Sequence, residues 1–253
     1  MKLVAIVRVK NAKDTIKDCL SRLSDLCDEI IIVDNGSTDG TKKIYKKFHK
    51  IITINHTKGF NEGRDKNLLL KLAKKRNPDW ILWIDQDEIF EEIASRKILD
   101  KYMNNPKVNL VQFRLFHFWL SKTKYRVDGI WKTYTAFPQR FMWRNLKSAY
   151  FRNWRFHSGG IMGVPQPHLT SFIRLKHYGY TNKRQVAKKY KFYTDLKDDP
   201  MSKKTILLDP NDKKVRLKKW QPGLLNSYKD GVKWGLIDKF IKIKNLLLSY
   251  NIV

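Results

Sequence analysis

Cysteine is scarce in this chain of 253 residues, which has only Cys19 and Cys27. Two cysteines are too few for a disulfide framework. Both fall on the apolar stripe of a helix that we expect over residues 11–27, where eight positions span roughly 12 Å. That separation is too long for a disulfide bond. We therefore expect two reduced core cysteines, as is typical of an intracellular protein.

Long apolar runs are also missing. No stretch reaches the roughly 20 apolar residues that a transmembrane helix needs. The first apolar run, residues 3–7, is too short for the hydrophobic region of a signal peptide, and Arg8 ends it. The sequence thus predicts a cytoplasmic protein, with any membrane contact confined to the cytoplasmic face of a membrane.

Acidic residues are few: 24 Asp and Glu stand against 52 Lys and Arg, which gives a formal net charge of +28. Such an excess favours anionic partners such as nucleic acid, lipid headgroups, nucleotide phosphates or anionic glycans. Lysines are scattered along the whole chain, so compositional bias explains part of the excess. The apolar content of 42% supports a packed core rather than a disordered chain.

Two nucleotide-binding signatures are absent as well. No G-x-G-x-x-G follows the first apolar run, and the chain has no G-x-x-x-x-G-K-[ST]. A dinucleotide-binding or P-loop protein is therefore disfavoured. The chain shows no internal repeat, and its length fits one large α/β domain or one domain with an appendage.

Apolar periodicity predicts regular secondary structure in the first 90 residues and a weaker pattern beyond them. Strands are expected over 3–9, 29–33, 51–55 and 80–85, with helices over 11–27, 61–75 and from the loop 34–41 to about Phe48. This alternation argues for a parallel sheet with right-handed crossovers. Further along, the pattern predicts a helix over 93–103, a strand over 109–119, short strands and loops over 120–180, a helix over 185–195, a polar loop over 197–214 and a basic amphipathic helical stretch over 224–250.

The most informative segment is the end of the expected fourth strand, where an apolar run stops at Asp85, Asp87 and Glu88. The mouth of an open α/β sheet, where ligands bind, lies at the carboxyl ends of its strands. Two aspartates at positions i and i+2 of a strand point the same way and can share one hard cation. A divalent ion held there suits a diphosphate leaving group. The alternative is an acidic first turn of a helix.

Three further positions are candidates for binding. Asp34 ends the second expected strand, where its carboxylate can accept hydrogen bonds from a nucleobase or a ribose, although an ordinary β–α turn explains it too. Arg64 lies near a helix N-terminus and can reach a phosphate, whereas Lys66 is interpreted as a solvated residue. His177 lies among aromatic residues, typical of a core histidine, but beside an acidic metal site it becomes a candidate ligand.

Taken together, these pieces resemble a family 2 glycosyltransferase with the GT-A fold, an α/β, Rossmann-like and mostly parallel sheet flanked by helices. The resemblance is good over residues 3–90 and patchy to about 195. Its motifs are the segment 33–41, the F-x-x-x-R segment from Phe60, the D-x-D-E segment, the P-x-R-F segment 138–144, and the H-Y-G-Y segment 177–180. It implies a catalytic domain over 1–195, with a nucleotide-sugar half (1–105) and an irregular acceptor half (106–195), and a loop with a basic helical extension over 196–253.

The resemblance also implies a reaction and a set of site residues. The reaction is an inverting transfer of a sugar from a nucleoside-diphosphate donor, usually a UDP-sugar, with Mn²⁺ or Mg²⁺ bridging the diphosphate. The implied nucleotide-sugar contacts are Val9, Asn11, Asp34, Arg64, Asp85 and Gln86, and the implied metal ligands are Asp87, His177 and Asp85. Relatives carry a His-Glu pair in the acceptor half, where this chain has Phe156-His157-Ser158. Glu88 and Asp128 are therefore the candidates for the catalytic base, although Asp128 is equally well explained as a turn residue.

The sequence leaves open which acceptor receives the sugar. A glycan or a lipid-linked saccharide is the expected acceptor, and the stretch 224–250 either lies on an anionic membrane or packs on the catalytic domain. The charge of +28 also suits a modified base in a nucleic acid as the acceptor. Two other classes remain as alternatives, a non-catalytic nucleic-acid-binding protein on the same scaffold and a nucleotidyltransferase.

Overall fold

The computed structural model describes residues 1–195 and 214–222. Its strands are β1 (Leu3–Val9), β2 (Glu29–Asp34), β3 (Ile51–His56), β4 (Trp80–Asp85), β5 (Glu88–Phe90), β6 (Leu110–His117), β7 (Lys124–Arg126), β8 (Pro138–Arg144), β9 (His168–His177) and β10 (Leu217–Lys219). Its helices are α1 (Ile16–Leu26), α2 (Thr41–Tyr45), α3 (Glu62–Lys74), α4 (Arg96–Asn104), α5 (Gly129–Ala136) and α6 (Lys183–Asp195). The helical extension expected over 224–250 lies outside the described residues.

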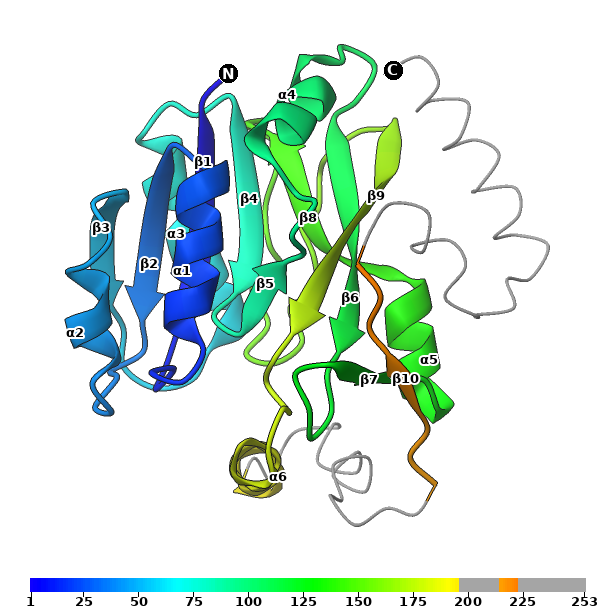
Figure 1. The fold of residues 1–253 in the computed structure, drawn as a ribbon. Helices are drawn as coiled ribbons and strands as arrows, with labels where there is room; N and C mark the ends of the chain where they lie inside the picture. Colours follow the sequence, from blue (N-terminus) through cyan, green and yellow to red (C-terminus); the bar gives the residue numbers. More distant parts are fainter. Residues whose placement is uncertain (196–213, 223–253) are drawn as a thin grey trace.

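One eight-stranded sheet runs through both halves of the predicted catalytic domain, in the order β3-β2-β1-β4-β8-β6-β9-β5. Its first four strands are parallel, which confirms the βαβ prediction. Beyond β4 the sheet is mixed: β8 is antiparallel to both β4 and β6, and β9 is parallel to β6 but antiparallel to β5. The strands β1, β2, β4, β6 and β9 therefore point the same way, and their carboxyl ends meet at one edge (Figure 1).

Helices cover both faces of the parallel part because its strands are apolar on both sides. Alternate residues of β1 divide between two cores: Ala5 and Val7 pack with the apolar stripe of α1, and Val4 and Ile6 pack with α3. Figure 1 shows α1 and α3 on opposite faces of the sheet. Helix α6 lies across the carboxyl edge, below the ends of the strands. Cys19 and Cys27 are both buried and free, as the sequence predicts.

Two short strands were not expected from the sequence, nor was helix α5, which lies where only short strands and loops were predicted. β5 forms immediately after the acidic segment and pairs with β9, so that segment is a strand-turn-strand rather than a helix start. β10 pairs with β7 and places the described residues 214–222 beside that strand. Among the described residues, no helix combines the length and the apolar character needed to cross a membrane.

Candidate functional site

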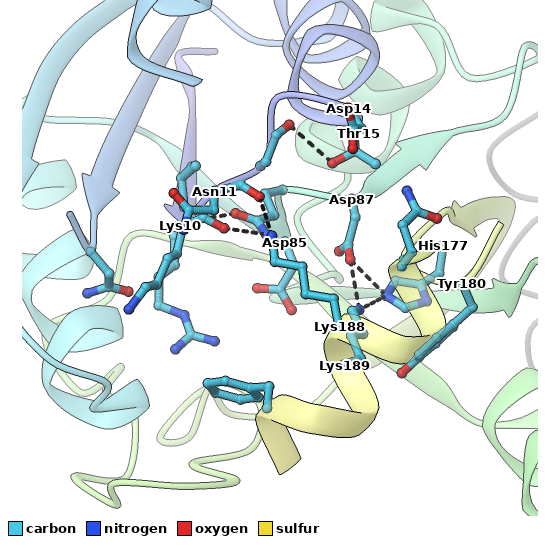
Figure 2. A pocket seen from close by; sticks show the side chains of 18 of the residues that line it. Lys10, Asn11, Asp14, Thr15, Asp85, Asp87, His177, Tyr180, Lys188 and Lys189 are labelled. Atoms are coloured by element: carbon cyan, nitrogen blue, oxygen red, sulfur yellow. Dashed lines mark hydrogen bonds and ion pairs between the residues drawn. The ribbon is translucent and has the colours of Figure 1, made fainter. Parts of the chain in front are cut away.

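A cavity of about 600 Å³ opens at the carboxyl edge of the sheet. Its walls come from the ends of β1, β4, β6 and β9, from the segment 156–157 that precedes β9, and from α6. Figure 2 shows acidic and basic side chains converging on it. The lining includes Arg8, Val9, Asn11, Asp14, Asn35, Asp39, Phe60, Asp85, Gln86, Asp87, His117, Trp131, Arg140, His157, His177, Tyr180, Lys188 and Lys189.

The acidic centre of the cavity is Asp87, which lies beside His177. The pairing of β5 with β9 sets Glu88 opposite His177, and the backbone of Tyr178 donates a hydrogen bond to the Asp87 carbonyl at 2.7 Å. Asp87, Glu88 and His177 each offer a donor atom, and these atoms lie within 4.8 Å of one another. Asp87 Oδ2 is 3.4 Å from His177 Nε2. Of the predicted metal ligands, the structure brings Asp87 and His177 together and adds Glu88 in place of Asp85.

A lysine from α6 completes this centre. Lys189 Nζ donates to Asp87 Oδ2 at 2.9 Å and lies 3.3 Å from His177 Nε2. Burial alone would raise the pKa of Asp87, but Lys189 and His177 hold it well below its ordinary value. Burial disfavours the charged form of Lys189, but the Asp87 carboxylate outweighs it and raises the lysine pKa. Both groups are therefore charged at neutral pH.

His117 backs His177 from the neighbouring strand β6. The two Nδ1 atoms are 3.0 Å apart, so one ring must donate and the other accept. His177 Nε2 lies 3.3 Å from the Lys189 ammonium, which can only donate, and 3.4 Å from Asp87 Oδ2, which can only accept. Burial lowers the pKa of His117 well below its ordinary value, so His117 is neutral. His177 Nε2 therefore faces the position beside Asp87, while Nδ1 faces His117.

Asp85 and Glu88 share a second cation, Arg140 from β8. Arg140 Nη2 is 2.8 Å from Asp85 Oδ2, and the same guanidinium holds the fully buried Glu88 carboxylate. The Asp85 backbone N–H also donates to Glu88 Oε2 at 2.9 Å. Burial raises the pKa of Glu88. Asp85 lines the cavity, whereas Glu88, one of the two predicted bases, lies beneath its wall with both oxygens engaged.

The structure does not bring three other predicted residues to the cavity wall. Asp34 is fully buried, and its oxygens accept from the backbone N–H of Ser37 at 2.6 Å and from the Tyr45 hydroxyl at 2.7 Å. Arg64 is turned outward and donates to backbone carbonyls of the preceding loop. Asp128 lies at the turn that starts α5, in line with the turn role considered from the sequence, and its carboxylate is held by Arg126 at 2.7 Å. Asn35 and Asp39 line the cavity where Asp34 was expected.

Val9, Asn11 and Gln86 do line the cavity. The Gln86 side chain bridges β4 to β1, since its amide accepts from Lys10 N at 2.6 Å and donates to Lys10 O. Asn11 Oδ1 accepts from the backbone of Thr38 at 2.8 Å and so fixes the loop that follows β2. These contacts fix polar side chains at the rim of the cavity, on the side where the sequence predicts nucleotide binding.

Lys66 differs from its interpretation as a solvated residue. It is 1% exposed, and Nζ lies 3.7 Å above the Trp83 ring. Its ammonium is paired with Glu62 at 2.5 Å and donates to Gly159 O at 2.8 Å. Burial lowers the pKa of Lys66 to about 8. The lysine therefore joins α3 to the segment that carries Phe156 and His157 into the cavity.

The same segment caps the start of α3. The backbone N–H groups of Glu62 and Gly63 donate to the carbonyls of Arg155 at 2.9 Å and Trp154 at 2.8 Å. These are N–H groups that a helix terminus leaves without an intrahelical partner. The sequence predicted the helix over 185–195 but not that it and this segment line the cavity, because their contacts join positions about 90 to 180 residues apart.

The donor atoms at Asp87 and His177 fit a divalent cation. A carboxylate oxygen and an imidazole nitrogen are both common ligands of divalent metals. A Cβ at residue 179 would lie 2.5 Å from Asp87 Oδ2, 2.8 Å from His177 Cε1 and closer still to Lys189 Nζ, so the glycine leaves room for these three side chains to meet. The Lys189 ammonium already makes the contacts that a cation would make there.

Residues 4–166 match the family model described as Glycosyl transferase family 2. This match covers more than half of the chain, which therefore belongs to that family. Its mixed sheet, with helices on both faces and the acidic segment after β4, has the GT-A fold that the sequence predicts.

Curated relatives match only part of the chain. O-antigen chain rhamnosyltransferase RfbN of Salmonella typhimurium is 29% identical over 115 residues, which cover 44% of this chain and 36% of that protein. Poly-beta-1,6-N-acetyl-D-glucosamine synthase of Staphylococcus aureus is 30% identical over 108 residues, which cover 40% of this chain and 25% of that protein. The match thus spans well under half of either relative's length.

Solved structures resemble the chain at low identity. The S. aureus TarS structure gives a TM-score of 0.48 at 16% identity and covers 82% of this chain and 42% of that chain. Glucosyl-3-phosphoglycerate synthase from Mycobacterium tuberculosis, in complex with Mn²⁺, uridine-diphosphate and glucosyl-3-phosphoglycerate, gives 0.44 at 14% identity, with 88% of both chains covered.

Proposed function

We propose that this protein transfers a sugar from a nucleoside-diphosphate donor, in the first place a UDP-sugar, to an acceptor hydroxyl with inversion and with the help of Mn²⁺ or Mg²⁺. The observation that carries the proposal is the pair Asp87 and His177, which converge on one cation position inside the cavity. Family membership supplies the reaction type, and the inversion rests on the resemblance to that family.

We assign different roles to the residues of the cavity according to their position. Val9, Asn11, Asn35 and Gln86 form the side that takes the nucleoside. Asp87 and His177 would hold the metal, which would supply positive charge to the departing diphosphate. Arg140 keeps Asp85 fixed at the sugar-facing wall. The acceptor oxygen bonds to the anomeric carbon as the bond from that carbon to the diphosphate oxygen breaks, and the hydroxyl proton goes to a base.

For the base we propose His157. Both bases expected from the sequence, Glu88 and Asp128, are tied to arginines and lie off the cavity wall. His157 lines the cavity with a positive φ of 50°, a conformation uncommon outside glycine that often marks a functional position. Asp14 is the second pocket-lining group to compare, because it is an exposed carboxylate at the rim.

A saccharide acceptor fits the cavity best. Trp131 and Tyr180 form an aromatic wall on the acceptor side, and such rings stack on sugars. The names of the two curated relatives, a rhamnosyltransferase of O-antigen chains and a synthase of a glucosamine polymer, favour the same class. The charge of +28 is the observation that favours a nucleic-acid or membrane-bound acceptor. Binding to duplex DNA that falls steeply with salt would favour the former.

The first test is calorimetric binding of UDP, GDP and CDP with and without Mn²⁺. We expect Mn²⁺-dependent binding of one nucleotide, weakened about 100-fold in Asp87→Asn, because losing a buried charge contact of this kind costs about 3 kcal/mol. Asp25→Asn is the matched control, since Asp25 is an exposed residue of α1. No nucleoside-diphosphate binding under any condition would contradict the proposal.

The base is tested by the rate at which nucleoside diphosphate is released from the donor. His157→Asn should lower kcat about 100-fold or more with little change in nucleotide affinity, because a general base contributes at least that factor. His49→Asn, at an exposed position, should leave kcat unchanged. A loss in Asp14→Asn with normal turnover in His157→Asn would move the role to Asp14.

A further inference from the structure

Lys189 occupies the position between the two candidate metal ligands, Asp87 and His177. Its ammonium lies between Asp87 Oδ2, at 2.9 Å, and His177 Nε2, at 3.3 Å, above the ring of Tyr180 at 4.5 Å. Figure 2 shows Lys189 reaching up from α6 to these two side chains, while Lys188 reaches Asn11. The lysine thus approaches from the helix that crosses the cavity, opposite the strands that carry its partners.

The ammonium and a divalent ion need the same two atoms. His177 Nε2 and Asp87 Oδ2 lie 3.4 Å apart, and both face the position that the ammonium occupies. A metal ion bound there must displace Lys189 Nζ, since two cations cannot share a contact distance to both atoms without strong repulsion.

Helix α6 keeps other contacts with the cavity when Lys189 moves. Lys188 Nζ donates to Asn11 O at 3.0 Å, the Phe192 ring packs edge-on against Phe60 with centroids 5.2 Å apart, and Val186 is fully buried in an aromatic cluster. The helix therefore holds the displaced ammonium inside the cavity. The Lys189 side chain is 28% exposed, so its flexible stem has room to turn.

The displaced ammonium has one favourable new partner. Asp85 and Glu88 already accept hydrogen bonds from Arg140. The diphosphate of the donor brings new negative charge next to Asp87. We propose that Lys189 is a mobile cation of this site: it occupies the metal position between Asp87 and His177 in the empty protein and moves to the donor's diphosphate when a divalent ion binds. This inference rests on the proposed function.

The proposal predicts two opposite effects of removing the ammonium. Lys189→Met keeps the length of the stem but no longer competes for Asp87, so Mn²⁺ alone should bind about tenfold more tightly, the equivalent of one charge-assisted hydrogen bond. With saturating Mn²⁺, the same variant should bind the nucleoside diphosphate about tenfold more weakly. A lysine that only supports the fold does not produce effects of opposite sign.

The experiment measures free Mn²⁺ by electron paramagnetic resonance during titration of the full chain, and then UDP and GDP binding by calorimetry at saturating Mn²⁺. Lys191→Met is the matched control, because Lys191 is exposed on the same helix and does not line the cavity. It should match the wild type in both titrations. Circular dichroism of each variant checks that the fold is retained.

Each other combination of Mn²⁺ and nucleotide binding results overturns a defined part of the inference. Unchanged or weaker Mn²⁺ binding in Lys189→Met overturns the competition between the lysine and the metal. Tighter Mn²⁺ binding with unchanged nucleotide affinity overturns the move to the diphosphate. Tighter Mn²⁺ binding by the variant, combined with no nucleotide binding even by the wild type, contradicts the proposed function but still supports competition at Asp87.

Discussion

Arg174→Met should lower the free energy of unfolding by about 3–5 kcal/mol at neutral pH, because it leaves the carboxylate of Glu91 buried without its cation. Both side chains are fully buried. Arg174 Nη2 is 2.7 Å from Glu91 Oε2, and the backbone N–H of Arg174 donates to Glu91 Oε1 at 2.7 Å. The pair joins the end of β5 to β9, the two strands that bring Asp87 to His177.

The same arginine holds the described segment 214–222 on the sheet. Its guanidinium donates to the Gln221 carbonyl at 2.7 Å and lies 3.8 Å from the centroid of the Trp220 ring. The substitution therefore removes a cation–π contact as well as the ion pair. We expect the loss in stability to be accompanied by loosening of β10, visible as faster amide exchange at 217–219.

The pH dependence of this variant has a defined sign. Burial raises the pKa of Glu91 in the folded protein, and removing Arg174 removes the group that opposes this rise. A carboxyl whose folded pKa is raised favours folding in its protonated form, so its penalty is absent below the unfolded pKa and grows as the pH rises toward the folded pKa. The stability deficit should therefore be larger at pH 8 than at pH 5.

Urea unfolding of four proteins tests this account. Glu91→Met combined with Arg174→Met should recover most of the loss, because no buried charge is left. Arg76→Met is the control: Arg76 pairs with Glu29 at 3.0 Å but its side chain is 44% exposed, and such surface pairs contribute little to stability. Equal losses in Arg76→Met and Arg174→Met would contradict the role of burial.

The parallel half of the fold could be predicted because its signals are local. Apolar runs locate β2 and β3 to within one residue, and β1 and β4 are predicted at their exact bounds. Each of these elements lies between turn residues, and β1, β2 and β3, which follow one another in the sequence, are also neighbours in the sheet. The acidic segment at Asp87 and the candidate ligand His177 could also be identified from the sequence, because each belongs to a local pattern.

The rest of the site depends on pairings that no local pattern encodes. The register of β5 on β9 joins residues 88 and 177, and Lys189 reaches Asp87 across 102 positions. Arg140 lies in the P-x-R-F segment that the sequence singled out, but no local pattern shows that it holds Asp85 and Glu88. The burial of Lys66 cannot be seen in the sequence either, because its partner Gly159 O belongs to an irregular segment. The sequence therefore located Asp85 and Asp87 correctly but did not predict their cationic partners.

Gly63→Val should remove most nucleotide binding and lower the free energy of unfolding by about 3 kcal/mol, the upper end for an overpacked site. A Cβ on residue 63 would lie 2.6 Å from Trp154 N and 2.8 Å from Asn153 Cα, and closer still to the Arg152 carbonyl. These are backbone atoms, so no side chain can rotate to make room. The start of α3 and the segment 152–155 must separate.

The functional consequence follows from what this segment carries. Its next two residues, Phe156 and His157, line the cavity, and the Phe156 ring stacks on Phe60 with centroids 5.6 Å apart. Separation also breaks the hydrogen bonds from Glu62 and Gly63 to the carbonyls of the segment. Even Gly63→Ala, which intrinsic helix propensity favours by up to about 1 kcal/mol, should destabilise the protein here.

Calorimetry and urea unfolding separate this account from a general effect on α3. Lys71→Ala, at an exposed position of the same helix, should change stability by no more than about 0.5 kcal/mol and leave nucleotide binding intact. A Gly63→Ala protein as stable as the wild type would show that the segment 152–155 does not dock on α3 in solution. His157 would then have no fixed position from which to act as the base, because the contacts of α3 with this segment are what place it at the cavity.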